Sequence, residues 1–348
     1  MTARERDDIY AALAEEAAAY PAGQPFHSVR ALMARFATSQ RTVEAVLERL
    51  MRANRLYRQG RRYYTRDVSA KRAPHYRFFY PDWSSEFIRA YCDAFEDAAA
   101  AAQGEFVLSR RGFAISENYL RDLPLDDSDG VFLIPQTRAI VGADLEALAA
   151  IPVPTVLLEY DVGGLGLSMV CGDSRSCGMQ AAAHLLRQGY SRLAALVTEP
   201  PCYVVSERCR GFMEFAGLSG AAAEVIDCNV VTGRLFKGVF YQTLMERLRK
   251  RDLDAIFLIS AHAALEVYKA VVDSGLRVGP DVGVITSDDL HSNAYMDPPL
   301  TSVGYAVGDA VAAAIAGMRA LPPTGGCFQE RLTPTLTPRA STVRAPSR

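Results

Sequence analysis

The chain has 348 residues, and its 38 Lys and Arg nearly balance its 40 Asp and Glu, so the net charge is -2. Hydrophobic residues make up 49% of the sequence, which argues against a disordered chain, and the length is that of two or three domains. The charge is unevenly distributed. Residues 1–75 hold fourteen basic and eight acidic side chains, and a basic segment before an acidic remainder is typical of a nucleic-acid-binding domain joined to a domain with another role.

The sequence shows no signal for export or membrane insertion and no ordered cysteine pattern. The first residues, MTARERDDIYAALAEE, are charged and lack the apolar stretch of a secretory signal. Apolar runs elsewhere are shorter than a membrane span. The seven cysteines are scattered, without a zinc-binding spacing. We therefore expect a cytoplasmic protein with reduced thiols, no membrane partner and no metal site.

Three helices are predicted at the amino terminus. Apolar residues recur at helical spacing through residues 5–19. Ser28 is suited to cap a second helix over 29–36, and Ser39 a third over 41–53. Short strands on either side of a Gly-containing turn follow, so a hairpin is expected next. These elements predict a winged helix-turn-helix domain.

We assign this domain to residues 1–66 and a polar linker to 67–76. Ten arginines lie between Arg30 and Arg66, against two acidic residues. In a helix-turn-helix the first turn of the second helix meets DNA, and here that turn is Ser39-Gln40-Arg41-Thr42. Ser and Thr can donate to phosphate, and Gln and Arg can read adenine and guanine edges. The alternative is that the arginines only form a solvated helix face.

A family resemblance covers this domain. SVRAL at 28–32, TVEAVLERL at 42–50 and RQGR at 58–61 resemble the winged helix of GntR-type bacterial regulators. His27, Gln40, Glu44 and Arg62 depart from the residues usual in that family, so the operator sequence stays open. The resemblance implies contacts with double-stranded operator DNA from Ser28, Arg30, Ser39, Gln40, Arg41, Thr42, Gly60, Arg61 and Arg62.

Beyond the linker, short apolar runs alternate with helical segments, a pattern that indicates parallel sheets covered on both faces. About 270 residues of this pattern is large for one sheet, so we expect two α/β lobes with a cleft between them. Strands are expected at 78–80, 106–108, 131–134, 156–158, 193–197, 255–259 and 282–286, and helices at 85–102, 176–188, 207–216, 240–250 and 263–274.

A second resemblance covers residues 76–342. The larger part of the chain is similar to the periplasmic-binding-protein-like core of LacI/GalR-type regulators, and with the GntR-like head it has the architecture of arabinose-repressor-type proteins. The resemblance implies a core at 77–342, with an amino-terminal lobe about 77–163 and 292–325 and a carboxy-terminal lobe about 164–291 and 326–342. It is carried by YPDWSSEF at 80–87, DGVFLI at 129–134, IPVPT at 151–155, GYSRL at 189–193, ERCRGF at 207–212, DD at 288–289, PLTSV at 299–303 and PTLTPRAST at 334–342.

Polyol ligands are bound by charged or amide groups on their hydroxyls and by aromatic faces on their C–H surfaces. Alternatives remain for three candidates. Trp83 can be a core aromatic, Arg208 a surface arginine, and Asp288 only a helix N-cap. By the second resemblance, the residues expected to bind a sugar-like effector are Trp83, Phe87, Glu159, Arg208, Phe236, Ser260 and Asp288.

One departure bears on the effector. After the strand at 255–259 the family usually has Asn-Asp, whereas this chain has Ser260-Ala261-His262. The change indicates either an altered ligand or a core that no longer responds to one. His262 is either a replacement ligand contact or a solvent-facing residue at a helix start.

Enzyme motifs are missing from the sequence. No P-loop, GxSxG or HExxH occurs, and Gly163-Gly-Leu-Gly166 lacks the spacing of a dinucleotide fingerprint. We expect no catalytic residue and no cofactor. The sequence predicts a homodimeric DNA-binding regulator, a repressor of carbohydrate-utilisation genes controlled by a sugar-like effector. The alternatives are a constitutive DNA-binding protein whose core serves only dimerisation, and an enzyme on a two-lobed fold.

Overall fold

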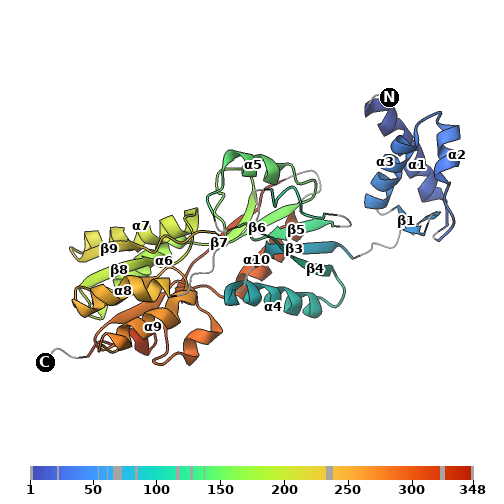
Figure 1. Ribbon diagram of the computed structural model, residues 1–348. Helices are drawn as coiled ribbons and strands as arrows, with labels where there is room; N and C mark the ends of the chain where they lie inside the picture. The colour runs from blue at the N-terminus through green and yellow to red at the C-terminus, as the bar shows by residue number, and fades with distance from the viewer. Residues whose placement is uncertain are drawn as a thin grey trace. The chain divides into compact units, whose positions relative to one another are not determined.

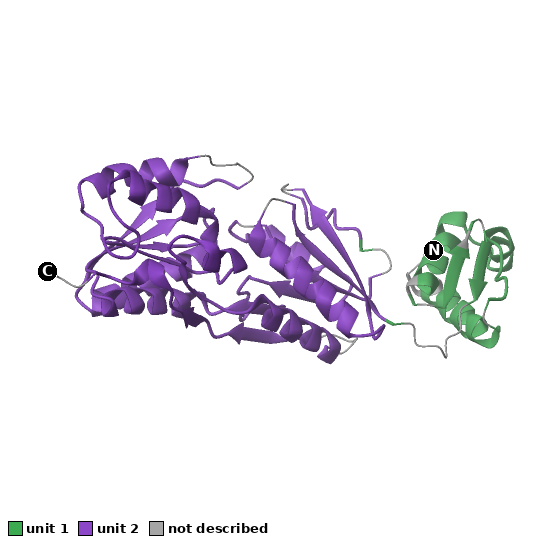
Figure 2. Ribbon diagram, turned by 90° about the horizontal axis from the view of Figure 1, so that it is seen from below, with its two compact units in different colours: residues 1–73, 125–127 green, residues 74–124, 128–348 purple. Residues whose placement is uncertain are grey.

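The structure, a computed structural model, forms two compact units (Figure 2): residues 1–73 with 125–127, and residues 74–124 with 128–348. The predicted contact residues Arg61, Trp83 and Phe236 lie outside the described residues. The structure describes residues 3–21, 23–53, 55–60, 62–65, 73–82, 85–114, 118–125, 128–136, 138–232, 238–321 and 326–345.

The first unit, called the head here, contains the predicted three helices and hairpin. Ser28 Oγ accepts a hydrogen bond from the Ala31 amide at 3.2 Å, and Ser39 Oγ accepts one from the Thr42 amide at 3.3 Å. Both serines therefore act as N-caps, as predicted. Leucines from all three helices and the first strand fill the core of the head. The elements are α1 (Ala3–Ala19), α2 (Val29–Arg35), α3 (Gln40–Arg52), β1 (Leu56–Gln59) and β2 (Arg62–Thr65), with β1 and β2 antiparallel.

The second unit, the core, contains two six-stranded sheets (Figure 1). In the amino-terminal lobe the strand order is β13-β7-β6-β5-β3-β4, and every neighbouring pair is parallel. Helices α4 and α10 pack together on this sheet around Phe78 and Phe132. The elements are β3 (His75–Pro81), α4 (Glu86–Ala101), β4 (Val107–Phe113), β5 (Gly130–Leu133), α5 (Gly142–Ala149), β6 (Thr155–Leu158), β7 (Ser168–Gly172), α10 (Val307–Ala320) and β13 (Gln329–Leu332).

In the carboxy-terminal lobe the strand order is β14-β12-β11-β10-β8-β9, parallel except for the pair β12 and β14. Apolar side chains of α8 and α9 pack on one another and on the sheet, and α6 packs against α7. The elements are α6 (Ser174–Arg187), β8 (Arg192–Val197), α7 (Tyr203–Leu218), β9 (Ala222–Asp227), α8 (Val239–Arg249), β10 (Ala255–Leu258), η1 (Ala261–Ala263), α9 (Ala264–Asp273), β11 (Gly283–Thr286), η2 (His291–Tyr295), β12 (Thr301–Gly304), β14 (Thr335–Thr337) and η3 (Ala340–Thr342).

The strand pairings correct the predicted lobe boundaries. Strand β7 pairs with β6 and β13 in the amino-terminal sheet, although residues from 164 on were assigned to the other lobe. Strand β12 pairs with β11 in the carboxy-terminal sheet, although 292–325 was assigned to the amino-terminal lobe. The chain passes between the sheets at 173, 305–306 and 333–334. Local sequence does not reveal these passages, because the sheet that β7 or β12 joins depends on pairing with strands far along the chain.

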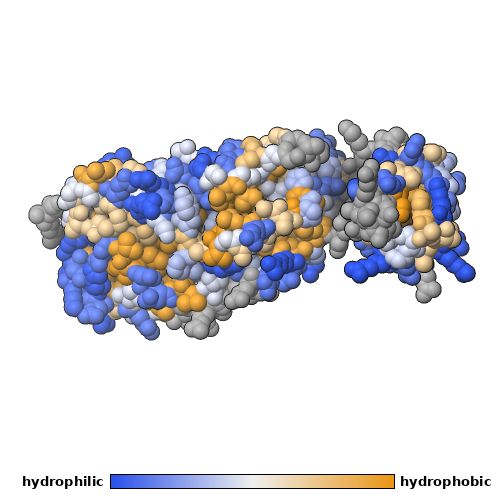
Figure 3. All heavy atoms as spheres, turned by 90° about the horizontal axis from the view of Figure 1, so that it is seen from above, coloured by the Kyte–Doolittle hydropathy of each residue, from blue (hydrophilic) through white to orange (hydrophobic). Residues whose placement is uncertain are grey.

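Exposed apolar side chains are dispersed over the core. Figure 3 shows them on one face of the molecule as separate groups among hydrophilic residues. The most exposed large ones, Leu218, Leu265 and Tyr295, come from α7, α9 and η2. Among the described residues, no helix combines the length and apolar character needed to cross a bilayer. All seven cysteines are free.

Two glycines let α6 and α7 approach closely. A Cβ at Gly178 would lie 2.0 Å from the Arg208 carbonyl oxygen, and one at Gly211 would lie 2.0 Å from that of Arg175. We expect Gly178→Ala to force the helices apart and to lower the free energy of unfolding by about 1–3 kcal/mol, as overpacking does. Chemical denaturation of the full chain measures this effect.

Gly217→Ala is the matched control, because Gly217 also lies on α7 but a Cβ added there would meet no atom within 4 Å. The control should stabilise the protein slightly, since alanine is a better helix former than glycine by about 0.5–1 kcal/mol. Equal effects of the two substitutions would contradict the close-packing account.

Candidate functional site

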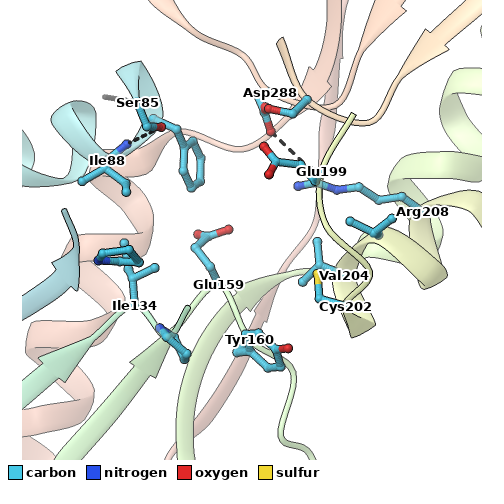
Figure 4. A pocket seen from close by; sticks show the side chains of 15 residues that line it. Ser85, Ile88, Ile134, Glu159, Tyr160, Glu199, Cys202, Val204, Arg208 and Asp288 are labelled. Atoms are coloured by element: carbon cyan, nitrogen blue, oxygen red, sulfur yellow. Dashed lines mark hydrogen bonds and ion pairs between the residues drawn. The ribbon is translucent and has the colours of Figure 1, made fainter. Parts of the chain in front are cut away.

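A cavity of the core lies at the carboxyl ends of parallel strands, where ligands bind in open α/β sheets. Its empty volume is about 740 Å³, and residues from both lobes line it (Figure 4). Loops after β5 and β6 contribute from the amino-terminal lobe, and loops after β8, β10 and β11 from the other. We call this cavity the cleft. Its lining is Pro81, Ser85, Phe87, Ile88, Ile134, Pro135, Glu159, Tyr160, Glu199, Cys202, Val204, Val205, Arg208, Ser260 and Asp288.

The structure brings together five of the seven residues predicted to bind effector. Phe87 lies on the first turn of α4, and Arg208 on the second turn of α7. Glu159, Ser260 and Asp288 each follow the end of a buried strand. The two remaining predicted residues are those outside the described parts of the chain.

Glu159 lies at the centre of the cleft wall, and Figure 4 shows its carboxylate pointing into the cavity. The hydroxyls of Tyr91 and Tyr305 both donate to its Oε1. Its φ of 64° is in the left-handed region that non-glycine residues rarely adopt, a strain that recurs at ligand sites. Burial raises the pKa of Glu159 despite the two tyrosine hydrogen bonds, which favour the ionised form.

Arg208 and Asp288 form a charge pair on the opposite lobe. Arg208 Nη1 lies 3.6 Å from Asp288 Oδ1 and donates to the Ile259 carbonyl oxygen at 2.8 Å. Only 12% of the Arg208 side chain and 7% of the Asp288 side chain are exposed. Burial opposes the charge of Arg208, but Asp288 and other anionic neighbours outweigh it and raise the pKa of the guanidinium. The surface-arginine alternative is therefore wrong.

Asp288 also has the structural role considered as an alternative. Its Oδ2 accepts a hydrogen bond from the Ala261 amide at 3.1 Å, at the start of η1, and Oδ1 accepts one from Ser287 Oγ at 3.3 Å. Asp288 thus holds the loop after β10 in place while it faces the cleft. Capping and a position in the cleft are compatible in this fold.

At the departure from the family pattern, Ser260 lines the cleft and His262 does not. His262 Nδ1 lies 3.1 Å from Ser260 Oγ and 3.3 Å from Glu199 Oε1. Partial burial lowers the pKa of His262, but the Glu199 carboxylate outweighs this and raises it overall. About half of the His262 side chain is exposed. His262 therefore lies at a helix start and is half exposed, as one of the two alternatives predicted. It also contacts Ser260 and Glu199, two residues that line the cleft.

Sequence reasoning missed Tyr91, Tyr305 and Glu199. Tyr91 lies four residues after Phe87 on α4, so both fall on one helix face, and their rings meet edge to face at 5.3 Å. Tyr305 directly follows β12, and Glu199 lies two residues after the end of β8. A polar residue just after a strand is thus a signal available for Tyr305 and Glu199, whereas Glu159, Ser260 and Asp288 are expected from the resemblance to LacI/GalR-type regulators.

The raised pKa of Glu159 predicts a pH-dependent effect of Glu159→Gln. The protonated form is favoured in the folded state, so its contribution to stability is complete below the usual pKa of 4.5 and is lost as pH rises through the raised value. The melting temperature of Glu159→Gln relative to the unsubstituted protein should therefore increase as pH rises from about 4.5 towards neutrality.

Glu246→Gln provides the control of opposite sign. Glu246 lies on the surface 2.6 Å from Lys250, whose hydrogen bond lowers the pKa of the Glu246 carboxyl. Its small contribution is present at neutral pH and lost on acidification. A melting-temperature difference for Glu159→Gln that does not change with pH would contradict the buried-carboxyl account.

In the head, the arginines fall into two groups. Arg35 pairs with Glu16 at 2.6 Å, Arg49 pairs with Asp7 at 2.5 Å and stacks over the Tyr10 ring at 3.9 Å, and Arg55 donates to the Ala14 carbonyl oxygen. These side chains tie helices together. The second group is Arg30, Arg41 and Arg62. These three are exposed, and none has a partner of this kind among the described residues of the head.

The remaining head candidates surround this second group of arginines. Ser28 and Ser39 are used as caps, and Ser39 Oγ also lies 3.0 Å from Thr42 Oγ1. Gln40 donates to Glu44 at 2.8 Å, which fixes its side chain on the exposed face of α3. Gly60, with φ of 62°, forms the hairpin turn and receives a hydrogen bond from Arg58 on its carbonyl oxygen.

The two-lobed parallel sheets, three connecting segments and central cleft define the periplasmic-binding-protein-like fold. Residues 182–342 match the family model described as a periplasmic binding protein-like domain. The core thus has the fold of LacI/GalR-type regulators. A crystal structure of a LacI family transcriptional regulator from Enterococcus faecium with bound ribose superposes with a TM-score of 0.64 and 21% identity, over 77% of this chain and 98% of that one.

Curated relatives agree with this class. The transcriptional regulator GalR of Escherichia coli is 28% identical over 222 residues, which are 62% of this chain and 63% of GalR. The transcriptional regulator MalR of Streptomyces coelicolor is 28% identical over 178 residues, which are 50% of this chain and 52% of MalR. The chain thus spans between half and two thirds of the length of these relatives, and both are transcriptional regulators.

Proposed function

We propose that the chain is a sequence-specific DNA-binding transcriptional regulator, a repressor of carbohydrate-utilisation genes that responds to a sugar-like effector in the cleft. The observation that carries the proposal is the separate head, where α3 exposes Gln40 and Arg41 on a capped first turn while other arginines are used internally. A core with a ligand-sized cleft and regulator relatives supports the second half of the proposal.

The head would act as a winged helix-turn-helix of the GntR type, as residues 1–66. In this reading α3 enters the major groove, Arg30 and the caps of α2 and α3 contact phosphates, and the hairpin around Gly60 to Arg62 is the wing. Two heads of a homodimer would occupy the half-sites of a pseudo-palindromic operator, because the symmetry of the dimer is matched by that of the DNA. The protein would thus combine a GntR-like DNA-binding head with a LacI-like effector-binding core.

Control would come from a change in the angle between the lobes. Ligand bound between Glu159 on one lobe and Arg208, Ser260 and Asp288 on the other would favour one lobe arrangement over another. The effector shifts this equilibrium only by its differential affinity for the two arrangements. Effector binding therefore need not abolish DNA binding completely.

Footprinting on the DNA that flanks the chain's own gene tests the DNA-binding half. We expect protection of two half-sites separated by a whole number of helical turns, with affinity that falls steeply as salt concentration rises. A protein that protects no particular sequence, or protects all sequences equally, would contradict the proposal.

The rival is a constitutive DNA-binding protein whose core serves only dimerisation, motivated by Ser260-Ala261-His262 in place of the usual family residues. Thermal-shift measurements with a broad panel of sugars separate the two. Saturable stabilisation that Arg208→Met removes would eliminate the rival, and DNA binding without any ligand response would support it.

A further inference from the structure

We propose that the effector is a polyol carrying a protonated amine, of the amino-sugar class, and that the ammonium group binds Glu159. This inference rests on the proposed effector function of the cleft and adds the charge of the ligand. The cleft combines an excess of acidic groups with a buried carboxylate that keeps one oxygen available. The excess of acidic groups disfavours an anionic sugar, and a carboxylate without an ion-pair partner favours a cationic one.

The first argument is the balance of charge. Among the described residues that line the cleft, three are acidic, Glu159, Glu199 and Asp288, and one, Arg208, is basic. Arg208 already faces Asp288 at 3.6 Å and donates to the Ile259 carbonyl oxygen, so these two charges largely offset one another. Among the described residues that line the cleft, acidic groups therefore outnumber basic ones, although the buried Nε of Arg208 has no hydrogen-bond partner.

The second argument is the hydrogen bonding of Glu159. The two tyrosine hydroxyls described for this side chain both donate to Oε1, so Oε2 is the oxygen left to face a ligand. Burial without a cation in direct contact is unfavourable for a carboxylate, which is why burial raises the pKa of Glu159. An ammonium group at Oε2 would form a charge-assisted hydrogen bond and relieve this cost. A neutral hydroxyl would relieve much less of it.

Glu199 supplies a second acidic group, and it differs from Glu159 in having a cationic neighbour. His262 lies 3.3 Å from Glu199 Oε1, and 24% of the Glu199 side chain and 48% of the His262 side chain are exposed. Glu199 is therefore already matched by His262 when that histidine is protonated. Of the acidic groups, Glu159 is the one without an ion-pair partner among the described residues.

The rest of the cleft suits the ring of a polyol. Pro81, Phe87, Ile134 and Tyr160 provide apolar and aromatic surfaces, while Ser260 and Asp288 provide hydrogen-bonding groups on the other lobe. An amino sugar would place its ring against the apolar wall and its hydroxyls against the carboxy-terminal lobe. Its amine would then contact Glu159.

Glu159 is also connected to the segments that join the lobes. Tyr305, which donates to Glu159, lies in the segment that runs from β12 to α10. The Tyr305 ring packs directly against Gly172, which precedes the first passage between the lobes. A Cβ added to Gly172 would lie only 2.3 Å from this ring. A smaller cavity behind Glu159 is lined by residues of all three connecting segments, Asp173, Tyr305 and Pro334 among them. A ligand that neutralises the charge of Glu159 would therefore change the hydrogen bond from Tyr305, which lies in a segment connecting the lobes.

The test compares matched sugars that differ only in charge. Thermal shifts of the full chain are measured at neutral pH with glucosamine, glucose and glucuronate, and with galactosamine, galactose and galacturonate. We expect at least one amino sugar to raise the melting temperature more than its neutral and acidic counterparts. Glu159→Gln should reduce this preference by tenfold or more in affinity, because it retains the shape and an acceptor for the tyrosines but removes the charge.

Two controls keep the result interpretable. Glu246→Gln removes a surface carboxylate far from the cleft lining and should leave the preference unchanged. The melting temperature without ligand shows whether Glu159→Gln remains folded. A series in which no amino sugar exceeds its neutral counterpart, or in which Glu159→Gln retains the preference, overturns the inference. DNA footprinting in parallel separates this outcome from failure of the regulator proposal, since a neutral sugar that alters footprinting leaves that proposal intact.

Discussion

Replacing Arg41 by alanine is expected to weaken operator binding by about thirtyfold or more. Arg41 is exposed on the first turn of α3, next to Gln40, whose side chain Glu44 fixes. An arginine that reads a base or holds a phosphate contributes about 1–3 kcal/mol, and a dimer loses this contribution in both half-sites. Fluorescence anisotropy with a labelled operator fragment at several salt concentrations measures the loss.

Arg49→Ala is the matched control for this substitution. Arg49 lies on the same helix, but it pairs with Asp7 and stacks over Tyr10, so it joins α3 to α1. Its removal should lower the melting temperature of the head and change DNA affinity less than Arg41→Ala does. If Arg49→Ala weakens binding as much as Arg41→Ala in a protein that remains folded, the assignment of α3's first turn as the reading surface is wrong.

Asp288→Ala should have the largest effect on the stability of the core. It leaves the Arg208 guanidinium buried without its carboxylate and removes the acceptor for the Ala261 amide. Breaking one half of a buried ion pair typically costs about 3–5 kcal/mol. In a core of this size that corresponds to a drop in melting temperature on the order of 10 °C. Any response to an effector should be lost with it.

Asp173→Ala separates loss of a cap from loss of the buried pair. Asp173 accepts a hydrogen bond from the Ser176 amide at 2.9 Å and caps α6, but it is exposed. Its removal should cost only about 1 kcal/mol, the usual contribution of an N-cap. Comparable losses for the two substitutions, measured by chemical denaturation, would mean that Asp288 acts as a cap alone and that its pairing with Arg208 contributes little.

Much of this architecture was predictable from local sequence. The two serine caps and the glycine turn at Gly60 were sufficient to predict the helices and hairpin of the head, because capping and turn formation depend on nearby residues. Every predicted strand of the core is present, since buried parallel strands are continuous apolar runs. Of the strands that were not predicted, β9, β13 and β14 are partly exposed, and β12 (TSVG) is buried but lacks a continuous apolar run.

The division of the core into lobes was less predictable. Whether a short strand such as β7 or β12 pairs with one sheet or the other depends on contacts far along the chain, which no local pattern encodes. The same holds for the cleft. Residues after strand ends were identifiable, but the two tyrosines on Glu159 come from α4 and a connecting segment, brought together only by folding.

We propose that this chain recognises DNA sequence through α3 and the hairpin. Selection from a randomised double-stranded DNA library with the full chain tests it most directly, with the double variant Arg30→Ala, Arg41→Ala selected in parallel. We expect the unsubstituted chain to enrich a pseudo-palindrome, with binding that weakens steeply as salt rises, and the variant to enrich no sequence. Equal enrichment by both proteins, or by neither, would contradict it.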